Sequence, residues 1–258
     1  MAGGKVGRVD FDFTHAARAM NANPPRYAVP LPDLDLSPTL HAAIFDMDGL
    51  MLDTERIALG CWHDAACALG LTLTREDALG MVGMHSSKAP AYLAGLYGPD
   101  FPVRALIDAT HQRYLAAMEQ PIPLKAGLID LLDWLAREQL PCAVATSTRR
   151  RIAEHHLDAV GILPRFRHTV CGDEIEHPKP APDIYLKAAG LLGVAPEHCV
   201  VFEDSNFGVQ AAHAAGCRVI MVPDMLPPRP ETLALGMPVV NSLAEAHALT
   251  STWLAASR

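Results

Sequence analysis

Short apolar runs alternate with helix-length amphipathic segments along most of the chain. Five runs are continuous and apolar, as buried parallel strands are: residues 42–47, 142–146, 168–171, 199–202 and 218–222. Between the later runs, apolar residues recur at helical spacing near residues 127–139, 149–160, 182–192 and 206–215. This alternation predicts an α/β fold with a doubly wound, Rossmann-like parallel sheet, and ligands at the carboxyl ends of its strands.

The connection between the first two runs is far too long for one helix. It is mostly helical in pattern, near residues 55–69, 75–81, 87–96 and 103–118. We therefore expect an α-helical cap at residues 54–124, inserted into a catalytic core made of residues 41–53 and 125–258, with Pro121 and Pro123 marking the return. Residues 1–40 are rich in proline and show little periodicity, so an irregular extension is expected there.

Charge and hydropathy disfavour two classes of partner. A net charge of −8 argues against general binding to nucleic acid or anionic lipid, because both require a basic surface. No apolar run approaches the roughly 18 to 20 residues of a membrane helix, and no secretory signal is visible at the N-terminus.

The six cysteines lack CxxC spacing, which indicates reduced thiols and a cytoplasmic protein.

Acidic residues follow the first and fourth apolar runs. The first ends in DMDG at residues 46–49, and the fourth in EDS at residues 203–205. Two carboxylates 4 Å apart repel by roughly 4 kcal/mol at an effective dielectric near 20, so these acids can converge only around a cation. All-oxygen ligation favours Mg²⁺, whereas no paired Cys/His spacing supports zinc despite twelve histidines. Taken alone, Asp48-Gly49 is equally compatible with a supporting turn.

The other two strand ends supply hydroxyls and a cation. The second run ends in ATST at residues 145–148, and HPKPAP at residues 177–182 follows the third. Prolines on both sides of Lys179 stiffen its loop and make its ammonium a candidate partner for an anion, with a surface linker as the alternative. Thr146 and Ser147 precede two arginines and are also candidates for an ordinary helix N-cap, a role compatible with phosphate binding.

Four motifs thus occur in a fixed order: DMDGLMLDTE at residues 46–55, ATST at 145–148, HPKPAPDIY at 177–185 and VVFEDSNFGVQAAHAAG at 200–216. This ordered set resembles the haloacid dehalogenase-like superfamily. The likeness is closest to the subgroup with a helical cap after the first strand, which includes β-phosphoglucomutase and phosphoglycolate phosphatase. It covers about residues 42–223, so the first 40 residues fall outside it.

The resemblance implies catalysis through an aspartyl-phosphate. It makes Asp46 the nucleophile and Asp48 the acid/base. Thr146 would hold the transferring phosphoryl group, and Lys179 would neutralise both that group and Asp46.

The metal ligands that the resemblance implies for Mg²⁺ are Asp46, the Asp48 carbonyl and Asp204. Glu203 is a further candidate ligand. Adjacent side chains on a strand point to opposite faces, so Glu203 and Asp204 can both reach the ion only if the strand has already ended.

Asp48 also separates the subfamilies, because the family's dehalogenases lack an acid there and its transport ATPases have threonine. A phosphatase or a phosphomutase remains. β-Phosphoglucomutase places basic cap residues near the motif that here is GMVGMHSSK at residues 80–88, but Val82 and Ser86 stand at the matching positions. His85 and Lys88 are the cations left there, and with Ser147 they are the candidate substrate-binding residues; a solvated loop residue is the alternative for His85.

We therefore expect Mg²⁺-dependent hydrolysis of a small phosphorylated metabolite, similar to a sugar phosphate, by a monomer or weak homodimer. A phosphomutase is the alternative. A catalytically idle binding protein on the same fold is a second alternative, from a different class.

Overall fold

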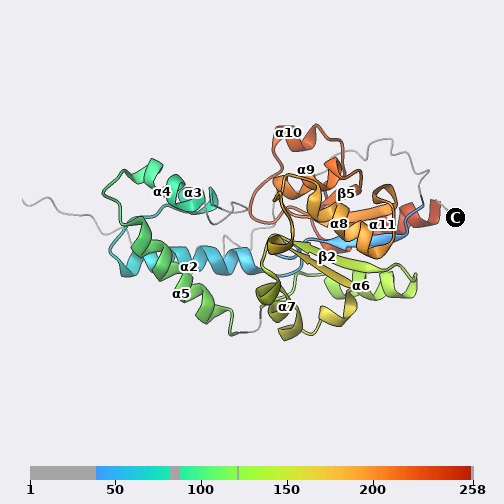
Figure 1. Ribbon diagram of the computed structural model, residues 1–258, viewed down its shortest axis with the longest axis horizontal. Helices are drawn as coiled ribbons and strands as arrows, with labels where there is room; N and C mark the ends of the chain where they lie inside the picture. The colour runs from blue at the N-terminus through green and yellow to red at the C-terminus, as the bar shows by residue number, and fades with distance from the viewer. Residues whose placement is uncertain (1–38, 82–87, 121, 257–258) are drawn as a thin grey trace, which may run out of the picture.

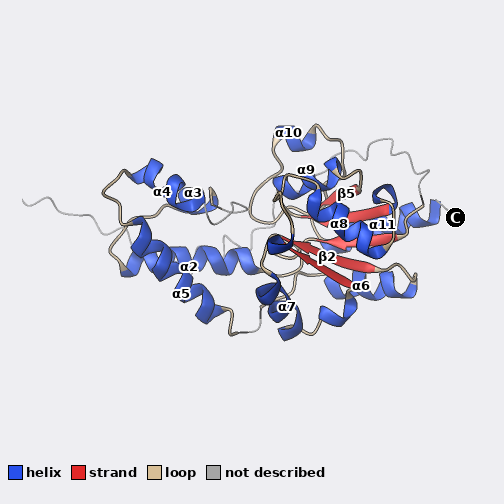
Figure 2. Ribbon diagram, in the orientation of Figure 1, coloured by secondary structure: helices blue, strands red, loops and turns tan. Residues whose placement is uncertain are grey.

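The computed structural model describes residues 39–81, 88–120 and 122–256, so nearly all of the extension expected at residues 1–40 lies outside the described residues. A five-stranded parallel sheet forms the centre of the molecule, in the order β3-β2-β1-β4-β5. Figure 2 shows its strands between layers of helices. The strands are β1 (Ala42–Phe45), β2 (Cys142–Thr146), β3 (His168–Cys171), β4 (Cys199–Glu203) and β5 (Arg218–Met221).

Helices cover both faces of the sheet, because successive strand residues point to opposite sides. In β1, Ala43 and Phe45 join the apolar cluster formed with α6 (Leu128–Arg137), α7 (Arg150–Ala159) and α11 (Leu243–Ala256). Ala42 and Ile44 join the opposite cluster, with α8 (Asp183–Leu192) and α9 (Asn206–Ala214). Burial on both faces explains why the strands are continuous apolar runs, and the predicted α/β fold is confirmed.

The long connection after β1 is helical, as predicted. It contains α2 (Thr54–Ala68), α3 (Arg75–Leu79), α4 (Ala89–Tyr97) and α5 (Val103–Ala117), which we call the cap. Figure 1 shows the cap on one side of the core, with α2 and α5 packed side by side. The cap has an apolar cluster of its own, whose buried members are Leu59, Ala65, Ala66, Ala78, Met81, Ala89, Leu93 and Leu106.

Two short linkers join the cap to the core, and their backbones pair. The Asp53 amide donates to the Pro123 carbonyl, and the Lys125 amide donates to the Met51 carbonyl, each at 2.9 Å. Leu52 and Leu124 form the antiparallel bridge between these two hydrogen bonds. The cap therefore attaches through two linkers paired by a single bridge, only a few residues after β1.

Three strand boundaries differ from those predicted. β1 ends at Phe45, which leaves Asp46 in the following loop, and β4 continues through Glu203. β5 ends at Met221, one residue before the predicted end. After β5 the chain forms α10 (Pro230–Leu233) and α11, neither of which the apolar pattern predicted. Within the described ranges, no helix combines the length and the apolar character needed to cross a membrane.

Candidate active site

The predicted catalytic acids lie at the point where the strand order reverses. From β1 the chain proceeds to β2 and β3 on one side, and then to β4 and β5 on the other. In a sheet of this kind, a crevice opens at the carboxyl ends of the two central strands. The loop after β1, which carries Asp46 and Asp48, meets the end of β4 there, and the Asp46 amide donates to the Phe202 carbonyl at 3.0 Å.

Lys179 connects two of the acids. Its Nζ lies 2.5 Å from Oδ1 of Asp46 and 2.7 Å from Oε1 of Glu203, and it also donates to the Ala145 carbonyl at 3.2 Å. Burial alone would lower the pKa of Lys179, but the charges of Asp46 and Glu203 hold that pKa well above its usual value. The ammonium therefore stays charged and fixed beside Asp46.

Glu203 has its carboxylate fully engaged by protein donors. Oε1 accepts hydrogen bonds from Lys179 and from the Tyr185 hydroxyl at 2.7 Å. Oε2 accepts from the Ser205 amide at 2.9 Å and from the Ser205 hydroxyl at 3.0 Å. Glu203 is also the last residue of β4, so the condition for a direct metal bond, a strand that ends before it, is not met. The geometry favours an indirect role, in which Glu203 positions Lys179.

Three threonine hydroxyls hold the Asp48 carboxylate. Thr54, at the start of the cap helix α2, donates to Oδ1 at 2.9 Å. Thr146 and Thr148 donate to Oδ2 at 3.2 and 2.7 Å. Thr146, predicted to hold the phosphoryl group, thus lies in the site, while Thr54 and Thr148 are neighbours of Asp48 to which the sequence had assigned no role. These bonds fix the orientation of the predicted acid/base.

Asp204 lies against the loop that carries the first two acids. A Cβ atom at Gly49 would come within 2.4 Å of Oδ2 of Asp204, and Gly49 has a φ of +86°, so glycine suits this position twice over. Burial, and then the charges of Glu203 and Asp46, raise the pKa of Asp204 well above its usual value. Burial likewise raises the pKa of Asp46 to about 8, although the charge of Lys179 opposes this.

Burial is the first cause of both shifts, and repulsion from the neighbouring acids adds to it. Two buried carboxylates beside a turn fit a hard divalent cation with oxygen ligands, and Mg²⁺ is the common choice. The residues present therefore fit the metal that the sequence predicted, with Asp46 and Asp204 as the side chains that would hold it.

The candidate substrate-binding residues come from separate segments of the chain. Ser147 is exposed, and the backbone after β3 approaches it so closely that a Cβ atom at Gly172 would lie 2.1 Å from the Ser147 carbonyl oxygen. Lys88 is exposed at the N-terminus of α4. His85 lies outside the described residues.

Gly208 makes room for Glu203, and this leads to a prediction. A Cβ atom there would lie 1.6 Å from Oε1 of Glu203, so Gly208→Ala must displace the carboxylate that anchors Lys179. We expect a loss of about 1–3 kcal/mol in the free energy of unfolding, measured by urea denaturation, as for other overpacked cores.

Gly190→Ala is the matched control for that substitution. Gly190 is also helical, in α8, but a Cβ atom there would meet nothing within 4 Å. We expect it to raise stability by roughly 0.5–1 kcal/mol, because glycine is a poor helix former. Equal stability changes in the two variants would contradict the packing argument for Gly208.

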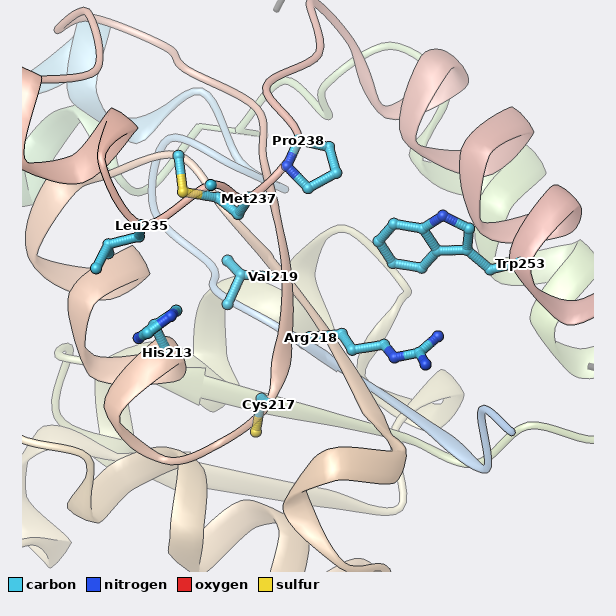
Figure 3. Close-up of a pocket in the computed structure, with 9 residues that line it drawn as sticks. His213, Cys217, Arg218, Val219, Leu235, Met237, Pro238 and Trp253 are labelled. Atoms are coloured by element: carbon cyan, nitrogen blue, oxygen red, sulfur yellow. The ribbon is translucent and has the colours of Figure 1, made fainter. Parts of the chain in front are cut away.

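A separate cavity lies away from this site. Figure 3 shows it beside the edge strand β5, next to Cys217 and Arg218, where that strand begins. It has a volume of about 190 Å³, and the Trp253 indole closes one side, with the Arg218 guanidinium 5.8 Å from its ring centroid. Because the predicted catalytic acids follow the opposite ends of the strands, this cavity is not part of the candidate active site.

Comparison with known proteins agrees with the site. The family model described as haloacid dehalogenase-like hydrolase matches residues 43–222. Fructose-1-phosphate phosphatase YqaB of Escherichia coli is 35% identical over 184 residues, which are 69% of this chain and 94% of that protein. A phosphorylated carbohydrates phosphatase of Thermotoga maritima is 30% identical over 178 residues, 69% of this chain and 82% of that protein.

Solved structures show the same fold. A crystal structure of a putative β-phosphoglucomutase from Thermotoga maritima superposes with a TM-score of 0.69 and 27% identity, covering 83% of this chain and 99% of that one. The family match covers all four motifs, and both relatives are phosphatases by name. The chain therefore belongs to the haloacid dehalogenase-like hydrolases, as a phosphatase with a helical cap.

Proposed function

We propose that this phosphatase hydrolyses a small phosphorylated metabolite, similar to a sugar phosphate, through an aspartyl-phosphate on Asp46. The observation that carries the proposal is the buried contact of 2.5 Å between Asp46 and Lys179, with Asp48 two residues further along the same loop. The names of two relatives, a fructose-1-phosphate phosphatase and a phosphorylated carbohydrates phosphatase, support the sugar-phosphate class.

In the first half-reaction, an Asp46 carboxylate oxygen attacks phosphorus in line and the bond to the leaving oxygen breaks. Asp48 donates its proton to that oxygen, so the product leaves as an alcohol. Lys179 lies where it can balance charge on the phosphoryl oxygens, and Thr146 offers them a hydroxyl. In the second half-reaction, water attacks phosphorus while Asp48 takes its proton, the bond between phosphorus and the Asp46 oxygen breaks, and phosphate leaves with the Asp46 carboxylate restored.

We assign the metal to Asp46, Asp204 and the Asp48 carbonyl. Bound Mg²⁺ would supply positive charge against the phosphoryl oxygens. Glu203 acts through Lys179 in this assignment, because four protein donors already use its oxygens.

In this proposal the cap recognises the leaving group, since the core residues assigned above contact the phosphoryl group or the metal. His85 and Lys88 of the cap and Ser147 of the core are the proposed substrate contacts, in a protein divided into a cap at residues 54–124 and a core at residues 41–53 and 125–258. The six unpaired cysteines suit a reducing, cytoplasmic setting.

A phosphomutase is the second candidate, and the similarity to the Thermotoga maritima structure favours it. The two functions differ in product. A panel of hexose, pentose and triose phosphates with Mg²⁺ should release inorganic phosphate for at least one member in proportion to the substrate consumed. Isomerised sugar phosphate without phosphate release would replace the proposal with the mutase, and no turnover of any member would contradict both.

Metal removal gives a further prediction. Because buried acids outnumber the cations around Asp46 and Asp204, we expect EDTA to abolish phosphate release and added Mg²⁺ to restore it fully. Phosphate release is measured before chelation, after it, and after readdition of each divalent ion. Full turnover in chelated, metal-free buffer would rule out the proposed metal site.

A further inference from the structure

The loop between β5 and α10 (residues 222–229) reaches the cap by two side chains. Oδ1 of Asp224 accepts from Lys125 at 2.7 Å and from Arg56 on α2 at 3.1 Å. Met225, the next residue, packs against the apolar cluster of the cap. A loop of the core therefore contacts the cap by charge and by apolar packing together.

The base of the same loop is attached beside the proposed metal site. Asn206, the first residue of α9, donates to the Pro227 carbonyl at 3.2 Å and accepts from the Arg229 amide at 2.7 Å. Asn206 follows Asp204 by two positions and is itself buried. In Figure 1 the chain between β5 and α10 runs along the side of the core that faces the cap. The loop thus spans from the neighbourhood of Asp204 to the cap.

Asp224 also belongs to a compact charge cluster at the cap linkers. Lys125, on the second linker, lies 2.9 Å from Oδ1 of Asp53 on the first, and Arg56 lies 2.5 Å from the same oxygen. We call Asp53, Arg56, Lys125 and Asp224 the hinge cluster. It has two acids and two bases, and each acid contacts both bases. The cluster therefore joins both linkers and the β5–α10 loop.

Burial makes this cluster more than a surface feature. Exposed ion pairs contribute little to stability, but the side chain of Asp224 is only 4% exposed and that of Lys125 only 19%. Among the described residues, nothing donates a hydrogen bond to Oδ2 of Asp224, although that atom is buried. A carboxylate held at this cost, in place of an apolar residue, is better explained by position than by stability.

The cluster also lies within electrostatic reach of the catalytic acids. Burial, together with the charges of Asp48 and Asp224, raises the pKa of Glu55 to about 7. Glu55 precedes Arg56 on α2 and follows Thr54, whose hydroxyl binds the Asp48 carboxylate. A shift of the first turn of α2 would therefore move groups around Asp48.

We propose that Asp224 and Met225 are positioning residues: through the hinge cluster and the apolar cluster of the cap, the β5–α10 loop holds the cap in its position next to the loop that carries Asp46 and Asp48. The two linkers and this loop then fix the cap at three places. Through this loop, the part of the core beside Asp204 and the first turn of α2 are held in a fixed position relative to each other. For catalysis this inference rests on the proposed function, but its structural part does not.

Hydrogen exchange on the full-length protein tests the structural part. In Asp224→Asn we expect the amides of Asp53 and Lys125, which pair the linkers, to exchange about tenfold faster. The amides of Val144 and Val201 in the sheet should exchange as in the wild type. Met225→Ala, which leaves every charge in place, should accelerate the same two linker amides, and Asp224→Glu should restore slow exchange.

Asp133→Asn is the control, because Asp133 on α6 forms an exposed ion pair with Arg165 that lies within the core domain and does not involve the cap. It should leave the linker amides unchanged. If Asp224→Asn and Met225→Ala also leave them unchanged, the loop does not hold the cap and the inference is wrong. Sheet amides that accelerate equally would show general destabilisation, and would overturn it as well.

The catalytic part is tested with two substrates of different size. For the best sugar phosphate of the panel, kcat/KM of Asp224→Asn should fall about tenfold, because a misplaced cap misaligns the leaving group. For acetyl phosphate, whose leaving group is too short to need the cap, the change should be less than about twofold. An equal loss for both substrates would refute a positioning role. A wild type inactive on every phosphate would refute the proposed function, while hydrogen exchange would still decide the loop's role.

Discussion

Replacing Asp46 with asparagine is expected to reduce turnover by at least about 10⁴-fold, because a neutral amide is a poor nucleophile and a weaker metal ligand. Asp46 is buried beside Lys179, and its Oδ1 accepts the lysine's hydrogen bond. An asparagine oxygen can accept the same bond, so we expect the fold to survive. Phosphate release with saturating Mg²⁺ measures the effect, and thermal unfolding verifies the fold.

Asp48→Asn serves as the comparison. It keeps the nucleophile but removes the proton transfer, which commonly contributes 10² to about 10⁴-fold. Its loss should be smaller for a substrate with an acidic leaving group, such as p-nitrophenyl phosphate, whereas that of Asp46→Asn should not. Acid-quenched wild-type enzyme should carry the phosphoryl group on Asp46. A label on another residue, or wild-type rates in Asp46→Asn, would overturn the assignment of the nucleophile.

The sheet could be predicted because its strands are buried on both faces. Such strands are continuous apolar runs, and the predicted ranges of β2 and β3 agree with the structure to the residue. The site followed from the same feature, because parallel strands direct their carboxyl ends to one edge. That is why motifs separated by more than a hundred residues, such as those of Asp46 and Lys179, were expected to meet.

Contacts that depend on side-chain direction could not be predicted in this way. Whether Glu203 faces the metal or Lys179 depends on where β4 ends, and the apolar pattern stops one residue too early to decide. Tyr185 was visible in its motif, but its bond to Glu203 requires α8 to be placed against β4. Asp224 pairs with residues about 100 and 170 positions earlier in the chain, and no local pattern encodes such pairs.

The C-terminal helices escaped prediction for a different reason. α11 buries Leu243, Trp253 and Leu254, but alanines and threonines occupy much of the rest of its surface. The contrast between its two sides is therefore weak, and periodicity is a poor guide to a helix of this kind. α10 has four residues, which is too short to show a period.

Lys179→Met is expected to remove activity and to destabilise the fold. It leaves Asp46 and Glu203, which lie 2.5 and 2.7 Å from the ammonium, as buried charges without their shared partner. Breaking a buried pair in this way costs about 3–5 kcal/mol, and charge stabilisation of the phosphoryl group is lost together with it. Urea denaturation and phosphate release measure the two effects separately.

Lys187→Met is the matched control, because Lys187 is an exposed lysine paired with Glu174 on the surface. It should change stability by less than about 1 kcal/mol.

The double variant Lys179→Met/Glu203→Gln separates the two roles of the lysine. If Glu203 serves to position Lys179, then removing its charge relieves the repulsion that Lys179→Met creates next to Asp46. We expect the double variant to regain about 1–3 kcal/mol in the free energy of unfolding relative to Lys179→Met. Its activity should stay as low as that of the single variant, because no cation faces the phosphoryl group.

Glu203→Gln alone should retain Mg²⁺ activation, since Asp46 and Asp204 are untouched. A double variant no more stable than Lys179→Met would mean that Glu203 is not coupled to the lysine. Loss of Mg²⁺ activation in Glu203→Gln would mean that Glu203 is a metal ligand.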